Sequence, residues 1–299
     1  MSSVLCVGIA TLDRIFAVDR HPATPGKYRA TGRTVAGGGV AANAAVAVAR
    51  LGGQARFAGV VGDDEAGAMI AESLADEGVD MSRLRVLPGR LSPESIVLVD
   101  SSGERLIVNH ASEDLFEASE VPTLTEIDRP DVVLTDMRWR RGAVAALTAA
   151  RDLGVPGVVD CDHDPVDAPG ILERASHVVF GQSTLEAWTG SSDPGDALAI
   201  ASERLDAWVG VTVGSEGSWW LDSGRLEHAP AVEIVAVDTL GAGDVFHGAF
   251  ALGLAEEMTI REAIEFGSAA AALKCTRFGG RDGIPTRVEL ERFRSEEER

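Results

Sequence analysis

Short runs of apolar residues alternate with amphipathic stretches along most of this chain. The first run, residues 4–9, leads into polar Thr11 and Asp13. After about residue 130 the alternation becomes regular, and the apolar runs in DVVLTD, PGVVDCD, SHVVFGQ and WVGVTVG are separated by helical stretches such as 141–154 and 193–206. Nearly continuous apolar strands between helices are typical of a mainly parallel central sheet that helices cover on both faces. The pattern therefore predicts an α/β fold.

Two further segments have the pattern of exposed strands. One covers residues 26–36, and the other is a hairpin in which SIVLVD and RLIVNH flank the short turn Ser101-Ser102-Gly103. Short polar turns of this kind connect the two strands of a hairpin. We expect these segments to form a small β-sheet lid, built from about residues 14–36 and 93–112, on one domain that spans residues 1–299.

Composition and charge narrow the classes of function. Of the 299 residues, 45% are hydrophobic and 25% charged, as in a globular protein with a sizeable core. A net charge of −20 argues against nucleic acid and anionic membranes as partners. No apolar run reaches the roughly 18 residues of a membrane span, and the first residues lack a signal-peptide pattern. Cys6, Cys161 and Cys275 are odd in number and far apart, so we expect a protein of the reducing cytoplasm.

The strongest chemical signal is the segment Asp238-Thr239-Leu240-Gly241-Ala242-Gly243-Asp244, directly before the apolar helix VFHGAFALGL. Small residues at 241–243 allow backbone amides to approach an anion at the positive end of a helix. Asp244 would lie beside that anion, where its carboxylate could take a proton from an attacking hydroxyl group. A glycine-rich turn with an aspartate at a helix start is the simpler interpretation. The chain has no Walker A lysine pattern, so this segment is not a P-loop.

A second motif lies about 200 residues earlier, in Gly38-Gly39-Val40-Ala41-Ala42-Asn43 and the alanine-rich helix that follows. Together the two motifs resemble the signatures of the ribokinase-like, phosphofructokinase-B carbohydrate kinases, and the resemblance covers essentially the whole chain. Gly37-x-Gly39-x-x-Ala42 also matches a loose dinucleotide-binding fingerprint. That fingerprint should follow the first strand, which here is followed by Ala-Thr-Leu-Asp instead.

The resemblance implies a ribokinase-like fold and a set of site residues. It implies a kinase that uses ATP and Mg²⁺, with a sugar as substrate and a homodimer as the assembly. Asp244 would be the base, and the amides of Gly241, Ala242 and Gly243 would form the anion hole. The sugar hydroxyls would contact Asp13, Gly38, Gly39 and Asn43. The nucleotide would lie along Thr212, Gly214, Gly217 and Gly243.

The chain departs from the family pattern where the metal is organised. Members usually carry an N-x-x-E motif, but the corresponding positions here hold Gly181 and Thr184. A nearby Asp-x-Asn is represented by Asp160-Cys161-Asp162, so Asp162 or Glu186 could substitute, and the metal ligands stay unassigned. The loop 277–283 is a candidate for closing over the nucleotide or holding a monovalent cation. We expect His247, one turn beyond Asp244, to pack in the core.

Three polar residues could read the far end of the substrate. Lys27 precedes the first lid strand, Asn109 ends the hairpin, and Arg138 closes the strand VVLTD. Ligand groups collect at the carboxyl ends of the strands in such sheets, which favours Arg138. An ammonium, an amide and a guanidinium together would bind a tetrahedral oxyanion through charge-assisted hydrogen bonds. Ordinary solvated cations are the alternative.

The same residues resemble those of sulfofructose kinases, which phosphorylate C1 of 6-deoxy-6-sulfofructose in sulfoglycolysis. The resemblance rests on Gly-Lys in the lid, Asp-x-Arg-Trp at the sheet edge and ALKCTRFGGR near the end. It implies that Lys27, Asn109 and Arg138 bind the sulfonate. A kinase for fructose 6-phosphate, tagatose 6-phosphate or an uncharged ketohexose is the competing interpretation. A non-catalytic sugar-binding regulator on the same fold is an alternative of another class.

Overall fold

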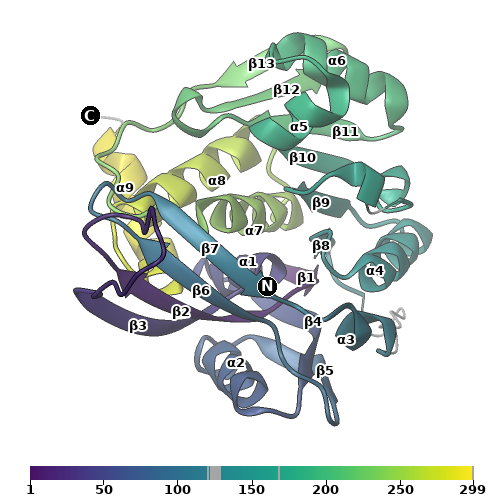
Figure 1. Cartoon of the computed structure of the whole chain (residues 1–299). Helices are drawn as coiled ribbons and strands as arrows, with labels where there is room; N and C mark the ends of the chain where they lie inside the picture. Colours follow the sequence, from purple (N-terminus) through teal and green to yellow (C-terminus); the bar gives the residue numbers. More distant parts are fainter. Residues whose placement is uncertain (120, 122–128, 168, 298–299) are drawn as a thin grey trace.

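The central sheet of the computed structural model has nine strands, and residues 1–119, 121, 129–167 and 169–297 are described (Figure 1). Its strand order is β13-β12-β11-β10-β9-β8-β1-β4-β5. The strands from β11 to β5 run parallel, and β12 and β13 form an antiparallel edge. The strands are β1 (Ser3–Val7), β4 (Gln54–Gly62), β5 (Asp80–Leu87), β8 (Val132–Thr135), β9 (Gly157–Cys161), β10 (His177–Gly181), β11 (Trp208–Thr212), β12 (Ser218–Asp222) and β13 (Arg225–Ala229).

Helices cover both faces of this sheet, as the apolar pattern predicts. On one face, apolar residues of α1, α2, α7, α8 and α9 form one buried cluster with the strands, and on the other face α3, α4, α5 and α6 contribute to two further clusters. The helices are α1 (Val40–Arg50), α2 (Glu65–Asp76), α3 (Glu113–Glu117), α4 (Arg140–Leu153), α5 (Gln182–Thr189), α6 (Pro194–Arg204), α7 (Ala242–Ala255), α8 (Ile260–Cys275) and α9 (Arg287–Glu297). Short 3-10 turns are η2 (Pro165–Asp167), η3 (Leu172–Arg174), η4 (Gly214–Glu216) and η5 (Gly280–Gly283).

Helices α1 and α7 pack unusually close to each other. A Cβ atom added to Gly248 of α7 would lie 2.5 Å from the carbonyl oxygen of Ala44 in α1. Only glycine fits such a backbone approach, and the alanine-rich sequence of α1 keeps the facing surface equally shallow. The N-terminal ends of these two helices are therefore held at a fixed separation.

The lid is a second sheet of four strands, in the order β3-β2-β6-β7. It consists of β2 (Thr11–Ala17), β3 (Gly32–Gly38), β6 (Glu94–Val99) and β7 (Arg105–His110). Its inner face buries Ile15, Val97 and Val99 against the domain. The predicted lid is confirmed in outline, although β2 begins at Thr11, earlier than expected, and the segment between β2 and β3 is a loop until Gly32.

The segment 54–92 carries structure that the apolar pattern did not resolve. It contains β4, α2 and β5, and β4 lies between β1 and the edge strand β5. In the part of the chain that the structure describes, no helix is long and apolar enough to cross a membrane.

Candidate active site

The glycine-rich segment before α7 forms a tight turn that opens the helix, as predicted. Gly241 is the N-cap with φ of 76°, a left-handed conformation that glycine adopts without strain. Asp238 stabilises the turn by accepting hydrogen bonds from the amides of Leu240, Gly279 and Gly280 at 2.8, 3.1 and 3.1 Å. The amide of Ala242 donates to the Thr239 carbonyl at 3.2 Å. The amides of Gly241 and Gly243 and the positive helix end are then the groups best placed to bind an anion.

Asp244 lies in the first turn of α7 and is held by one side chain. The amide nitrogen of Asn43, in α1, donates to Asp244 Oδ2 at 2.7 Å. Burial raises the pKa of Asp244 to about 7, the nearby charge of Asp160 adds to this, and the bond from Asn43 opposes it. A carboxylate with a pKa close to neutral accepts a proton more readily than an ordinary aspartate, which suits a general base.

His247 packs in the core as expected, at 3% exposure, and also forms a buried ion pair near Asp244. Its Nδ1 lies 2.9 Å from Asp160 Oδ2 and 2.7 Å from the carbonyl oxygen of Gly243. Burial disfavours the imidazolium, but Asp160 and the Gly243 carbonyl outweigh it and raise the pKa of His247 to about 9. The raised pKa favours the ion pair with Asp160, which the expectation of core packing did not include.

Asp13 lies on the inner face of the lid, where it is buried at 8% exposure. Thr11 Oγ1 donates to Asp13 Oδ1 at 2.8 Å. Burial raises the pKa of Asp13, while hydrogen bonds from Thr11 and Ser95 and the charge of Arg281 oppose the rise. A Cβ atom on Gly38 would lie 2.1 Å from Asp13 Oδ2. Glycine at this position leaves room for the carboxylate.

Asn109 belongs to the same row of the lid as Asp13. Asp13 pairs with Ser95 on β6, and Ser95 pairs with Asn109 on β7, so the three side chains lie on one face. Asn109 Nδ2 donates to Ser95 Oγ at 3.1 Å. The structure thus brings together two residues that are 96 positions apart in the sequence.

A cavity of about 580 Å³ borders the other side of the anion turn. The four residues predicted to contact the nucleotide, Thr212, Gly214, Gly217 and Gly243, all line it. Its walls also include Val232, Phe246 and Ala271, which would suit an apolar ring system. The structure therefore gathers these four positions around one space beside Asp244.

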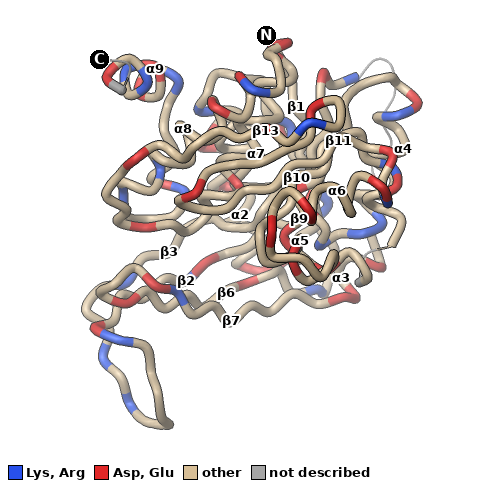
Figure 2. The backbone as a smooth tube through the Cα atoms, turned by 90° about the horizontal axis from the view of Figure 1, so that it is seen from above, with Lys and Arg blue, Asp and Glu red and all other residues tan. Residues whose placement is uncertain are grey.

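Arg138 and Lys27 are placed less simply. Arg138 follows β8 at the carboxyl ends of the central strands. Its Nη2 lies 2.6 Å from Asp162 Oδ2, so Arg138 is not an isolated cation. Lys27 is exposed on the loop between β2 and β3, which projects beyond the lid sheet (Figure 2). The structure does not bring Lys27 together with Asn109 and Arg138.

Arg281 is a site residue that the sequence did not single out for this role. It is only 4% exposed and comes from η5, more than 200 positions after its three hydrogen-bond partners Gly38, Asn43 and Ser73. Nothing in the local sequence FGGRDG distinguishes a buried arginine from an exposed one.

The comparisons with known proteins agree with this geometry. The model of the pfkB family carbohydrate kinases matches residues 1–287. A ribokinase from Bacillus subtilis is 28% identical, with 99% of this chain and 100% of the relative covered, and a fructokinase from Klebsiella pneumoniae is 31% identical over 85% of this chain and 91% of its own. The crystal structure of a candidate ribokinase from Agrobacterium tumefaciens has a TM-score of 0.95 and 41% identity, covering 100% of both chains.

Two signatures, a lid sheet, an aspartate in the first turn of α7 and a family match over nearly the whole length converge on one assignment. The chain belongs to the pfkB family and is an ATP-dependent carbohydrate kinase.

Proposed function

We propose that this kinase phosphorylates the C1 hydroxyl of a ketohexose that carries an anionic group at C6, and specifically 6-deoxy-6-sulfofructose. The observation that carries the proposal is the position of Arg138. Its guanidinium uses one nitrogen for Asp162 and is 37% exposed, at the sheet edge where β1 and β8 end. A guanidinium has five N–H donors, so further donors are available for a sulfonate.

The arrangement around Asp244 supports the following reaction. Asp13 holds sugar hydroxyls from the lid side, and the second N–H of Asn43 is available for another hydroxyl. Asp244 takes the proton of the C1 hydroxyl as its oxygen attacks the γ-phosphorus of ATP, and the bond to ADP breaks. The amides of Gly241 and Gly243 stabilise the negative charge on the transferred group.

Magnesium accompanies ATP in this reaction, and the local carboxylates fit it only in part. Among the described residues, no group of three or more His, Cys, Asp and Glu side chains is arranged to hold a metal ion. Asp160 is paired with His247, whereas Asp162 has a side chain that is 34% exposed and pairs with Arg138. Mg²⁺ typically keeps several waters and uses one or two carboxylates plus phosphates. We propose Asp162 as the protein ligand, with Glu186, which accepts a hydrogen bond from Gln182, as the alternative.

A substrate panel tests the anionic specificity. The wild type should transfer phosphate to sulfofructose faster than to fructose 6-phosphate, tagatose 6-phosphate, fructose and ribose. Arg138→Ala should lower kcat/KM for sulfofructose by about ten- to a hundredfold, because each hydrogen bond to a charged group is worth roughly 1.5–3 kcal/mol. Activity on fructose should change far less. Arg140→Ala, which removes a neighbouring exposed arginine, is the matched control.

Lys27→Ala belongs in the same panel because its loop must fold over the lid before Lys27 can contact a substrate. Equal losses on charged and neutral ketoses would reject the anion-binding role of either residue. A preference for fructose 6-phosphate over sulfofructose would reject the sulfosugar and leave the kinase assignment intact.

A neutral sugar is the second candidate, and one observation favours it. The Arg138–Asp162 pair at 2.6 Å is electrically satisfied without a substrate, so an anion must compete with Asp162. The names of the relatives, ribokinase and fructokinase, also point to uncharged sugars. Higher kcat/KM for fructose or ribose than for any anionic sugar would decide in favour of this candidate.

We also propose that two copies pair through the outer face of the lid. Ile96, Leu106 and Val108 on this face are 49%, 38% and 60% exposed, and β7 is an edge strand. Exposed apolar sheet faces of this kind are typical of interaction surfaces. Val108→Glu should convert a dimer to a monomer in light scattering, whereas Val288→Glu, on an exposed position of α9, should not. A monomeric wild type would refute the pairing.

A further inference from the structure

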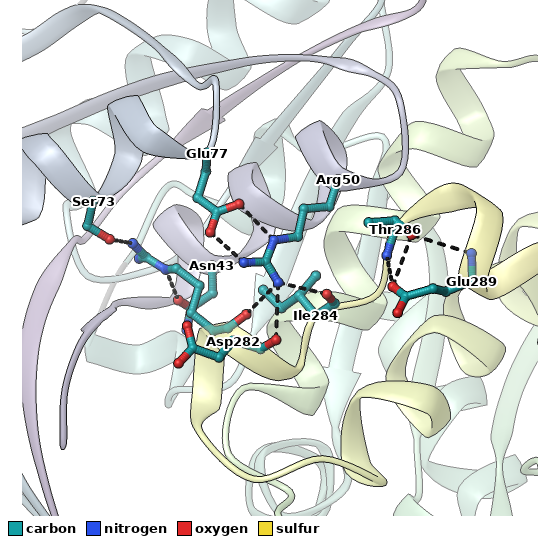
Figure 3. A network of polar contacts seen from close by, with 9 residues as sticks. Asn43, Arg50, Ser73, Glu77, Asp282, Ile284, Thr286 and Glu289 are labelled. Atoms are coloured by element: carbon teal, nitrogen blue, oxygen red, sulfur yellow. Dashed lines mark hydrogen bonds and ion pairs between the residues drawn. The ribbon is translucent and has the colours of Figure 1, made fainter. Parts of the chain in front are cut away.

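Arg281 carries a buried guanidinium whose charge interacts with the carboxylates of both Asp13 and Asp244. Arg281 extends from η5 and donates to Asn43 Oδ1 at 3.1 Å, to Ser73 Oγ at 2.9 Å and to the Gly38 carbonyl at 3.1 Å. Figure 3 shows Asn43 and Ser73 converging on this group from different helices. Its donors therefore connect α1, α2 and the end of β3 to a loop near the C-terminus.

The contact with Asn43 fixes which way the Asn43 amide faces. Arginine can only donate hydrogen bonds, so the Asn43 oxygen must face Arg281. The Asn43 nitrogen then faces Asp244, whose ionised carboxylate can only accept. The flipped amide would place two donors together on one side and two acceptors together on the other.

We infer that Arg281 is a positioning residue for the base, acting through the amide of Asn43. With Asn43 Nδ2 bound to Asp244 Oδ2, the carboxylate is oriented and its Oδ1 is left for the substrate hydroxyl. The inference rests on the proposed role of Asp244 as base, and it assigns the C-terminal loop a part in that chemistry. Arg281 itself contacts neither Asp244 nor the reacting atoms.

The surroundings of Arg281 hold it in place before any substrate binds. A Cβ atom on Gly37 would lie 2.0 Å from Arg281 Nη1, so glycine makes room for the guanidinium. Arg50 clamps the loop from outside, because its Nη1 donates to the carbonyls of Arg281 and Ile284 at 3.1 and 2.8 Å (Figure 3). Glu77 in turn binds Arg50 through both carboxylate oxygens.

The charge of Arg281 also belongs to the electrostatic environment of the base. Burial lowers the pKa of Arg281 to about 10, with Asp13, Glu77 and Asp244 opposing, so it stays protonated at neutral pH. The negative charges facing Asp244 are Asp160 and Asp162, and the positive ones are His247 and Arg281. Removing Arg281 leaves the negative pair less compensated and makes ionised Asp244 harder to form.

The test is a double-mutant cycle between Arg281 and Asn43, read with the best sugar from the panel. Arg281→Met should lower kcat about ten- to a hundredfold at pH 7 with little change in the KM for ATP. The acidic limb of its pH profile should move to higher pH. Arg281→Lys keeps the charge and loses the three-way contact, so its limb should move less. In an Asn43→Ala background, Arg281→Met should cost little more.

Arg50→Met is the matched control, because it loosens the same loop without contacting Asn43. It should lower the Tm and leave the pH profile unchanged. Full additivity of the Arg281 and Asn43 costs, or an unshifted pH profile in Arg281→Met, would overturn the inference. Should Arg281→Met fail to fold, the Arg281→Lys cycle decides by the same criterion.

Asp244→Asn, measured in parallel, separates the proposed base from the proposed positioning residue. Normal turnover in that variant refutes Asp244 as the base. Loss of turnover together with additive Arg281 and Asn43 costs refutes only the positioning role of Arg281.

Discussion

An Asp244→Asn enzyme is expected to lose on the order of 10²–10⁴-fold in kcat, because a positioned general base contributes that much to proton transfer. Asparagine has nearly the same shape as aspartate. Its side-chain oxygen can still accept the hydrogen bond that Asn43 Nδ2 donates to Asp244 Oδ2 at 2.7 Å in the wild type. Sugar and ATP should therefore bind with nearly unchanged affinity. Steady-state turnover together with calorimetric titration of each ligand measures both effects.

The same variant should be more stable than the wild type in alkaline buffer. Burial raises the folded-state pKa of Asp244 from 3.8 to about 7, so the folded protein holds a proton that the unfolded chain releases. The free energy of unfolding contributed by this group therefore declines as pH rises from about 4 to 7, and the ionised, buried form is a cost above pH 7. Asparagine removes that cost, and thermal melts at pH 8 should give a higher Tm. Near-normal kcat would contradict the assignment of Asp244 as base, and an unchanged Tm at every pH would contradict its raised pKa.

Replacing Asp13 with alanine is expected to lower kcat/KM for the sugar by about a hundredfold or more. The carboxylate lies on the inner face of the lid and would accept hydrogen bonds from two sugar hydroxyls, each worth roughly 1.5–3 kcal/mol. The KM for ATP should stay within about twofold, because the cavity expected to hold the nucleotide is lined by β11, the turn before α7 and α8, and by no lid residue. Initial-rate kinetics with each substrate varied in turn give the two values.

Asp19→Ala supplies the control for this change, since Asp19 is exposed in the lid loop. It should leave both KM values unaltered. If Asp13→Ala raised the KM for ATP as much as that for the sugar, its effect would be a general disturbance of the fold. If it changed neither, the sugar would bind elsewhere.

The parts of this structure that the sequence predicted are those encoded locally. The apolar runs at β8 to β11 and the glycine-rich start of α7 each carry their signal within a few residues, and the structure has them where expected. The segment 54–92 was not resolved in the same way, because β4 and β5 carry mixed patterns, with arginines at 56, 83 and 85.

The parts that could not be predicted depend on contacts between distant positions. The pairing of His247 with Asp160 requires α7 and β9 to lie side by side, and nothing in the sequence of either segment indicates that contact. Arg281 reaches Asn43 across 238 positions. Arg138 was correctly expected at the sheet edge, but its neutralisation by Asp162 follows from how β8 and β9 end side by side.

The close contact of Gly248 with Ala44 makes the N-terminal ends of α1 and α7 one mechanical unit. Asp244 and the Asn43 amide that donates to it lie on that unit, whereas Asp13 and Asn109 lie on the lid. The contact between Asn43 and Asp244 is therefore made by two helices and by no lid strand. Because of this separation, substitutions on the lid can change which sugar is accepted and leave the contact between Asn43 and Asp244 unchanged. A scaffold with this division is suited to acquiring new substrates by small steps, since each step leaves a working catalyst.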